Sequence, residues 1–424
     1  MIDGPTLVFV FMSLLKCGLV VAILLGLVAY SVVAERRYSA WFQDRIGPNR
    51  VGMPLGGVSI AGFRIPVIRL FGLFQPVADG LKFLLKEEIT PGNVNKPYFY
   101  LAPVLAMVPA ILTSAVIPFG STVNLQPVAE WVSNQFKLGL DAATLAAFNS
   151  PAVIADLNVG VLFVFAIVSI SVYGIVIAGW SSNSKYPFLG SIRSSAQMIS
   201  YEIAMGLAVV PVFLVIGNLN LQEIVNYQAQ NGWLALAVFA PDSAWRDSGV
   251  MSQSLVLWPF LALSFFIFLV AAFAETNRLP FDLPECETEL VGGYHTEYGA
   301  FKFALFFLGE YAAMLVTSCV MVTLFFGGWT LPLPWFNGTP IPESWTFLGS
   351  LAGQPMPLWF FLVHIGVFLS KMAFFIFFFI WVRWSFPRFR YDQLMDLGWK
   401  FFLPVALANV VIVAFVVAYF ELQG

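Results

Sequence analysis

The stretch Phe273–Tyr311 reads FAETNRLPFDLPECETELVGGYHTEYGAFKFALFFLGEY and separates two long apolar runs. It carries six glutamates in a chain of which only 11% of residues are charged; these are Glu275, Glu285, Glu287, Glu289, Glu297 and Glu310. A hydrated loop accounts for those near its middle. Glu310, however, lies well inside the following apolar run, where an acid costs about 2.5 to 3.5 kcal/mol. The acidic stretch therefore begins at a membrane surface and continues into the membrane, which indicates a path for protons or cations.

The composition outside this stretch is that of a membrane protein. The chain has 424 residues, of which 59% are hydrophobic and 17% aromatic, whereas about a quarter of the residues in a soluble domain are charged. Runs of about 20 apolar residues are long enough to cross a bilayer as helices. About eight such runs can be read, at Leu7–Val33, Phe99–Ile117, Val159–Trp180, Ser195–Ile216, Leu255–Ala274, Phe301–Phe326, Leu358–Val382 and Phe401–Phe420. We therefore expect an all-α integral membrane protein with a single polytopic domain over residues 1–424.

The basic residues predict the orientation of these spans. Eight spans place both termini on one side, and Lys and Arg gather in cytoplasmic loops. Seventeen of the 21 basic residues fall in the loops after the odd-numbered spans, and only Lys137 and Arg246 fall in the opposite loops. Both termini are thus expected on the outer, periplasmic side. Residues 34–98 and the acidic residues 275–300 then form cytoplasmic loops, and residues 119–158 and 217–254 form external insertions.

Several kinds of site are not expected from the sequence. The three cysteines are scattered, which argues against disulfides and metal sites. The chain has no glycine-rich nucleotide loop, no HExxH and no haem-type CxxCH motif, so it is expected to bind no nucleotide, iron–sulfur cluster or haem by itself. No nucleic-acid partner is expected either. The first apolar run contains Lys16 and no clear small-residue cleavage site, so it is interpreted as a retained span.

The first cytoplasmic loop combines a charged segment with an amphipathic helix. The segment AERRYSAWFQDRIGPNRVG, residues 34–52, is rich in both charges and is broken by Gly47 and Pro48. It is followed by FGLFQPVADGLKFLLKEE, residues 71–88, with apolar side chains at helical spacing. This pattern predicts a helix along the membrane interface. Asp79 and Lys82 either form a surface ion pair or line a passage for an amphiphile that enters from the bilayer.

Ionisable residues within other spans need an explanation because they are costly in lipid. Glu202 in the fourth span is expected to be functional or paired. Lys371 in the seventh is expected to have a buried acidic partner or a functional role. For Lys16 and His364 we favour structural roles. In the acidic stretch, Pro280 and Pro284 oppose a regular helix, and an extended chain would place the three glutamates 285, 287 and 289 on one face.

Five segments carry a resemblance to a known family. They are ERRYSAWFQDRIGPNRVG, GLFQPVADGLKFLLKEE, RSSAQMISYE, the acidic stretch itself and FPRFRYDQLMDLGWKFFLP. In order and spacing they resemble the H subunits of the proton-pumping NADH-quinone oxidoreductase, respiratory complex I. The resemblance covers most of the chain from the first cytoplasmic loop to the last. The long external loops and residues 327–357 match no pattern of that family and look like insertions.

The resemblance implies a role within a larger enzyme in the bacterial plasma membrane. Family members form much of the tunnel by which a quinone reaches the last iron–sulfur cluster. FMN and the clusters belong to partner subunits, and the other partners are peripheral-arm, small membrane and antiporter-like subunits, together with lipid. Positions that match the tunnel or the junction with the peripheral arm are Glu35, Arg36, Arg45, Asp79, Arg278, Arg388 and Arg390. Positions that match the acidic proton relay are Glu202, Glu275, Glu285, Glu287, Glu289, Glu297 and Glu310. The resemblance assigns the chain no catalytic residue and no metal ligand of its own.

Two other functions remain open on the sequence. One is the equivalent subunit of a membrane-bound hydrogenase or formate hydrogenlyase, which uses the same scaffold without quinone. The other is a secondary transporter that acts alone, although an acidic cluster at one edge fits poorly with a self-contained substrate site. The full ERRYSAWFQDRIGPNR segment and the acidic loop favour the quinone enzyme through resemblance.

Overall fold

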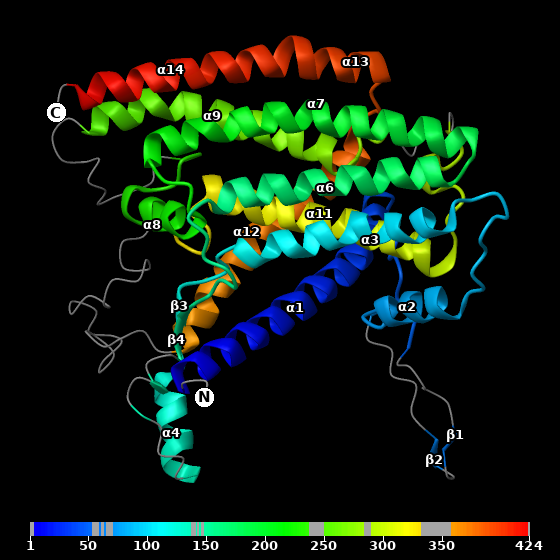
Figure 1. The fold of residues 1–424 in the computed structure, drawn as a ribbon, viewed down its shortest axis with the longest axis horizontal. Helices are drawn as coiled ribbons and strands as arrows, with labels where there is room; N and C mark the ends of the chain where they lie inside the picture. Colours follow the sequence, from blue (N-terminus) through cyan, green and yellow to red (C-terminus); the bar gives the residue numbers. More distant parts are fainter. Residues whose placement is uncertain are drawn as a thin grey trace.

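The fold is almost entirely helical and is arranged as a bundle of long helices (Figure 1). The computed structural model describes residues 4–52, 59–60, 63–64, 71–136, 141, 144–145, 148–236, 250–283, 290–331 and 358–422. Its elements within these ranges are α1 (Gly4–Phe42), β1 (Ser59–Ile60), β2 (Phe63–Arg64), α2 (Gln75–Leu85), α3 (Lys96–Thr113), η1 (Ser114–Val116), β3 (Thr122–Asn124), α4 (Gln126–Phe136), β4 (Asn149–Pro151), α6 (Gly160–Ser181), α7 (Lys185–Ile216), α8 (Leu221–Asn231), α9 (Val250–Glu275), η4 (Gly293–His295), α11 (Ala300–Phe325), α12 (Leu358–Ser385), α13 (Tyr391–Asp396), the π-helix η7 (Leu397–Phe402) and α14 (Leu403–Glu421).

Eight helical segments in the described part of the chain are long and apolar enough to cross a membrane. This confirms the expected all-α membrane fold with eight spans. The ends of the helices differ from the apolar runs, because helix formation does not require apolar side chains. Helix α1 continues nine residues beyond Val33 to Phe42, and α7 begins ten residues before Ser195, at Lys185. Glu35 therefore lies on a helix, and Glu202 lies roughly four to five turns inside one.

The helices alternate in direction, so that both chain ends lie at the same end of the bundle (Figure 1). Helix α3 packs against α6 and α11, α6 packs against α7, and α7 packs against α9 and α14. Helices α1 and α12 contact α11 and run obliquely below the others (Figure 1). The 39 residues of α1 span about 58 Å, which exceeds the ~30 Å of hydrocarbon in a bilayer, so the helix is long enough to extend beyond the membrane.

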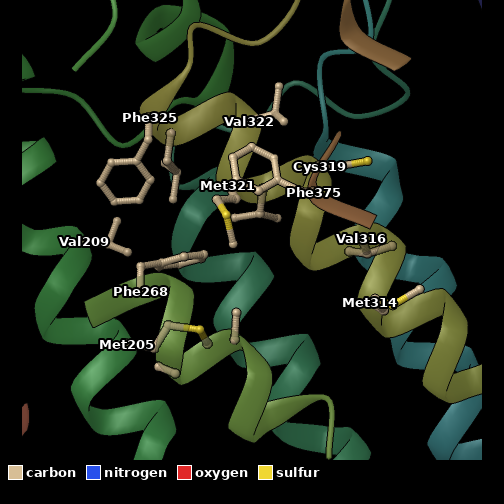
Figure 2. Close-up of a cluster of buried hydrophobic side chains, with 14 of the residues drawn as sticks. Met205, Val209, Phe268, Met314, Val316, Cys319, Met321, Val322, Phe325 and Phe375 are labelled. Atoms are coloured by element: carbon tan, nitrogen blue, oxygen red, sulfur yellow. The ribbon is translucent and has the colours of Figure 1, made fainter. Parts of the chain in front are cut away.

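The core lies where α7, α9, α11 and α12 meet. Figure 2 shows its side chains, among them Met205, Phe268, Met321 and Phe325, of which the last two are fully buried. Helix α11 is the most enclosed of these spans. In its most apolar stretch 67% of the residues are buried, compared with 17% in that of α1. An enclosed helix can hold charged groups among protein partners, away from lipid. Glu310 and Tyr311 both lie on α11.

The shorter elements lie at the two ends of the bundle. The predicted amphipathic helix is confirmed as α2, which has no buried residue and contacts α1 and α11. It lies at the end of the bundle opposite the chain termini (Figure 1). The antiparallel pair β3–β4, in which Thr122 faces Pro151, and the short helices α4 and α8 lie at the other end. A second antiparallel pair, β1–β2, lies beyond α2.

Candidate functional site

The centre of the candidate site is Arg278, three residues after the end of α9 and only 2% exposed. Its Nη1 donates a hydrogen bond to Oε2 of Glu35 over 2.9 Å. Its Nε lies 2.7 Å from Oε1 of Glu310. One buried guanidinium is therefore shared by an acid on α1 and an acid on α11, which are 275 positions apart in the sequence.

The loop that carries Arg278 is positioned by α7. The amide nitrogen of Gln197, a fully buried residue, donates to the carbonyls of Ala274, over 2.7 Å, and of Phe281, over 2.8 Å. These bonds hold both sides of the turn between Ala274 and Phe281. Pro280 prevents the helix from continuing through this segment. Arg278 is thus presented on an anchored loop.

Glu35 has two further partners. The Tyr311 hydroxyl donates to its Oε2 over 2.7 Å, and Arg383 of α12 forms an ion pair with its other oxygen. The guanidinium of Arg278 also lies over the Tyr311 ring, 4.1 Å from its centroid, a cation–π geometry. Helices α1, α11 and α12 meet through these contacts at the end of the bundle opposite the chain termini (Figure 1).

The charge state of Arg278 follows from its surroundings. Burial alone would lower the pKa of its guanidinium, but the carboxylates of Glu310 and Glu35 outweigh this effect and hold its pKa well above its ordinary value. Arg278 is therefore a fixed positive charge between two acids. A change in the charge of either acid alters its attraction to Arg278 and hence the hold on the other acid.

A second ion pair lies on the same loop. Oδ2 of Asp282 is 3.1 Å from Nη2 of Arg388. Burial raises the pKa of Asp282, and Arg388 and Arg383 lower it only in part, so that its pKa lies above the ordinary value. Asp282 therefore takes up a proton more readily than a solvated aspartate does. Its pairing joins the loop after α9 to the segment between α12 and α13.

A cavity of about 60 Å³ lies beside this cluster. Glu275 and Glu310 both line it, together with polar side chains of Ser171, Asn277 and Thr317. Oε2 of Glu275 is buried and has no protein hydrogen-bond partner among the described residues. The lining is mainly apolar, but these polar side chains face a volume large enough for a few water molecules. Within the described ranges, His, Cys, Asp and Glu form no group of three or more that could hold a metal ion.

Glu202 belongs to the same neighbourhood. The Ser169 hydroxyl of α6 hydrogen-bonds to its carboxylate, and Glu202 lies close enough to Glu275 for their carboxylates to repel each other. A smaller cavity of about 20 Å³ also adjoins Glu275 and is lined mainly by apolar residues of α6, α7, α9 and α11. Two of the predicted relay acids, Glu275 on α9 and Glu310 on α11, therefore line one cavity, and Glu202 on α7 lies near Glu275 without lining it.

The remaining predicted site residues lie outside both the Arg278 cluster and the cavity, or outside the described residues. Arg36 and Asp79 form an ion pair over 2.7 Å between α1 and α2. Arg45 and Arg390 are exposed and lie outside the Arg278 cluster, and within the described part of the chain they hydrogen-bond residues near them in sequence. Glu297 is partly exposed and does not line the cavity. Glu285, Glu287 and Glu289 lie outside the described residues.

Three basic residues within spans form hydrogen bonds, two of them with backbone carbonyls and one with a serine hydroxyl. Lys371 donates to the carbonyls of Phe326 and Gly328, over 2.7 and 2.9 Å, and to that of Thr330. It thus binds the backbone at and just after the C-terminal end of α11, and it forms no ion pair with an acid among the described residues. Lys16 donates to the carbonyls of Pro151, in β4, and Val153, just after it, and His364 hydrogen-bonds Ser121, just before β3. The structural roles expected for Lys16 and His364 fit these contacts.

Three members of the cluster were missed as site residues from sequence. Arg383 reads as an ordinary cytoplasmic anchor of α12, and Tyr311 reads as an aromatic residue of an apolar span. Asp282 lies within the acidic stretch, between Pro280 and Pro284. Of the three residues it is the one that this position in the sequence could have marked as a site residue.

Comparisons with known proteins show the family to which the chain belongs. The model of the family described as NADH dehydrogenase matches residues 15–414. The second of the H subunits of NADH-quinone oxidoreductase in Koribacter versatilis is 42% identical over 415 residues, which is 98% of this chain and 99% of that protein. The H subunit of the Leptospira biflexa enzyme is 44% identical over 93% of this chain and 91% of its own length. Subunit 8 of Rhodothermus marinus NADH-quinone oxidoreductase is 44% identical over 92% of each chain. The chain therefore belongs to the family of membrane-spanning H subunits of NADH-quinone oxidoreductase, complex I.

Proposed function

We propose that this chain lines the quinone access tunnel of NADH-quinone oxidoreductase and couples quinone reduction to proton translocation. The observation that carries the proposal is the sharing of Arg278 between Glu35 and Glu310. Glu35 lies on the side of α1 and α2, where the quinone would approach. Glu310 lies on the side of the cavity and the other acids.

The quinone side is supported by the properties of α2. This helix exposes apolar side chains, among them Leu81 (47%) and Leu84 (67%), while Asp79 pairs with Arg36 on α1. An amphipathic helix of this kind is suited to a membrane interface. A lipid-soluble quinone that moves along it would meet the charged end of α1, which carries Glu35. The apolar face would accommodate the quinone tail and the charged groups would face its head.

Coupling would pass through the balance of charge around Arg278. Reduction of a quinone changes charge and proton demand near Glu35. If Glu35 is neutralised, its attraction to Arg278 is lost and the guanidinium is held by Glu310 alone. If Glu35 regains its charge, the hold on Glu310 weakens. A charge change on the quinone side is in this way felt at Glu310 without a large movement of the backbone.

Protons would then move among Glu310 and Glu275, which line the cavity, and Glu202 near Glu275. Water in the cavity can bridge Glu310 to Glu275, which lines the cavity and whose buried Oε2 has no protein partner among the described residues. Glu202, close to Glu275, continues the path toward α7. Glu285, Glu287, Glu289 and Glu297 are proposed to extend it to the cytoplasmic surface.

The proposal includes partners and a location. The chain would act in the bacterial plasma membrane with the peripheral-arm quinone-site and iron–sulfur subunits, the small membrane subunits and the antiporter-like subunits. FMN and the iron–sulfur clusters would be held by those partners. The quinone is the substrate that this chain contacts, and lipid surrounds its spans.

The relay is tested by Glu275→Gln and Glu202→Gln in the assembled complex, each measured for quinone-linked NADH oxidation and for the proton gradient in membrane vesicles. Neither acid forms an ion pair in the described part of the chain, so both variants leave the Arg278 contacts intact. We expect both activities to fall at least about tenfold, since a proton-transfer group contributes roughly 10²- to 10⁴-fold. Electron transfer from NADH to a water-soluble acceptor that bypasses quinone is expected to stay at its wild-type rate.

The matched control is Glu223→Gln on α8, an exposed acid at the end of the bundle opposite Arg278. It is expected to leave both activities unchanged. Wild-type rates and gradients in Glu275→Gln and Glu202→Gln, with normal assembly, would contradict the relay.

A further inference from the structure

Lys302 is a buried cation that the sequence explains only as an anchor of the cytoplasmic side. It lies in the first turn of α11 and is only 4% exposed. A lysine that serves only to anchor a span extends its ammonium to the interface, whereas this ammonium is enclosed. A buried charge is costly unless it is paired and hydrogen-bonded. The partners of Lys302 therefore indicate what its charge does.

All of these partners belong to the connection from α2 to α3 or to the start of α3. Nζ donates to Oγ1 of Thr90 over 2.8 Å and lies 3.5 Å from Oε2 of Glu88. It also lies 4.5 Å from the centroid of the Tyr100 ring and 5.4 Å from that of Phe99. One side chain of α11 thus holds the segment that follows α2 in place.

The contact between Lys302 and the α2–α3 connection matters because α2 itself is held by few buried contacts. No residue of α2 is buried. Its ion pair to α1, Arg36–Asp79, has side chains that are 47% and 25% exposed, and exposed pairs contribute little. The turn before α2 is fixed, because Gly72 (φ 76°) packs so closely on the Pro48 carbonyl that a Cβ would collide with it. The other end of α2 depends on the segment that Lys302 holds.

We propose that Lys302 is a positioning residue that fixes α2 through the α2–α3 connection, and thereby sets the width of the quinone access path. The inference rests on the proposed function, in which the quinone passes along α2. Phe83 of α2 packs against Phe303 of α11, with ring centroids 6.5 Å apart. Lys302 is the neighbour of Phe303, so the aromatic contact and the charged contact brace α2 from the same turn of α11.

The test uses Lys302→Met in the intact complex, which keeps the apolar stem and removes the ammonium. Hydrogen exchange of residues 75–95 is expected to accelerate at least about fivefold. The KM for a long-tailed quinone is expected to rise by a similar factor with kcat nearly unchanged, because α2 is in its competent position for only a fraction of the time. The KM for a short-tailed quinone is expected to rise less, since its tail makes less contact with α2.

Two further variants separate this role from a general loss of packing. Thr90→Val keeps the shape of the acceptor and removes its hydroxyl, so it is expected to change exchange and KM in the same direction by a smaller factor. Lys302→Arg keeps the charge, so its hydrogen-exchange rate and its KM are expected to lie between those of the wild type and those of Lys302→Met. Lys400→Met removes an exposed ion pair with Asp396, whose partners are 74% and 61% exposed, and serves as the charge-matched control with no effect.

The outcomes distinguish the inference from the function on which it rests. Unchanged exchange of residues 75–95 in Lys302→Met and Thr90→Val would overturn the role of Lys302. Faster exchange with an unchanged KM for both quinones would support the hold of Lys302 on α2 and overturn the quinone path along α2. Faster exchange with a KM that rises for the long-tailed quinone would support both.

Discussion

At the scale of residues, the structure places one buried cation between two acids that the sequence separates by hundreds of positions. Arg278 is enclosed, and so are Glu35 and Glu310, whose side chains are 7% and 16% exposed. A buried ion pair need not stabilise a fold more than apolar residues would. It does make the arrangement sensitive to any change of charge. This sensitivity is what a coupling element requires.

Arg278→Met is predicted to destabilise this region strongly. Removal of one partner from a buried ion pair typically costs about 3 to 5 kcal/mol, because the other charge is left uncompensated. Adding Glu310→Gln removes one of the stranded acids and is expected to recover part of the loss. The measurement is the melting temperature and yield of the assembled complex for the two single variants and the double variant. Effects that simply add would mean that the two side chains are not energetically coupled.

The residues that the sequence could identify were those whose cost in lipid is evident. Glu310 and Glu202 stand out because an acid in an apolar run needs a reason. Their partners could not be found in this way, since Arg278 and Glu35 are 243 positions apart and only the fold brings them together. Lys371 illustrates the limit, because three backbone carbonyls satisfy its ammonium where an acid was expected. Every residue has a backbone carbonyl, so the sequence does not show which carbonyls accept a hydrogen bond from a buried lysine.

At the scale of elements, the walls of the cavity depend on close packing between α3 and α6. A Cβ at Gly174 of α6 would lie 2.7 Å from the backbone nitrogen of Ala106 and 2.9 Å from the carbonyl carbon of Leu105. These are backbone atoms of α3, between Pro103 and Pro109, and they cannot move aside as a side chain can. Ala106 and Pro109 also line the cavity.

Gly174→Ala is therefore predicted to force α3 and α6 apart and to destabilise the protein by about 1 to 3 kcal/mol, as overpacking does. The control is Gly206→Ala on α7, where a Cβ would meet nothing within 4 Å. That change is expected to be neutral or slightly stabilising, because alanine favours a helix by up to about 1 kcal/mol over glycine. Thermal stability of the assembled complex measures both. Equal stability of the two variants would contradict the tight contact.

The loop that contains η4 is predicted to weaken at acidic pH. Burial lowers the pKa of His295 to about 4 from an ordinary value of 6.5. Because the folded pKa is depressed, the neutral form is favoured in the folded loop, and the stability it gives is complete above pH 6.5 and is lost as the pH falls toward 4. The loss is about 1 kcal/mol between pH 6.5 and 5.5.

Amide hydrogen exchange of residues 290–299, corrected for the intrinsic pH dependence of exchange, measures this stability. His295→Gln has no imidazole to titrate and is expected to have a flatter pH dependence of the opening free energy than the wild type. The same slope in both proteins would mean that another group in the loop is responsible.

The sequence predicted which elements exist better than where they end. Hydropathy identified all eight spans and the amphipathic helix, because both follow from the apolar pattern along the chain. It ended α1 at Val33, where the apolar run stops, although the helix continues to Phe42. The added turns carry Glu35, whose charge is satisfied by Arg278, Arg383 and Tyr311. Partners supplied by the fold therefore let a helix continue beyond the boundary that hydropathy gives.

At the scale of the whole molecule, the charged groups are distributed unevenly between the two ends of the bundle. Helix α2 and the C-terminal end of α1, which carries Glu35 of the Arg278 cluster, lie at the end opposite the chain termini (Figure 1). The hairpin β3–β4, α4 and α8 lie at the other end, where Lys16 and His364 hold the hairpin. The arginine and lysine distribution predicts that the first end is cytoplasmic. The proposed tunnel and relay are thus both concentrated where a peripheral arm would dock.

The proposed function makes a specific demand on this arrangement: a quinone must pass the charged end of α1 and the surface of α2 on its way into the protein. A photoreactive long-tailed quinone analogue, bound to the assembled complex and followed by peptide mapping, tests this demand most directly. We predict labelling between Glu35 and Lys86 that is displaced by excess natural quinone and lowered in Lys302→Met. Displaceable labelling confined to other subunits, with none between Glu35 and Lys86, would contradict the account.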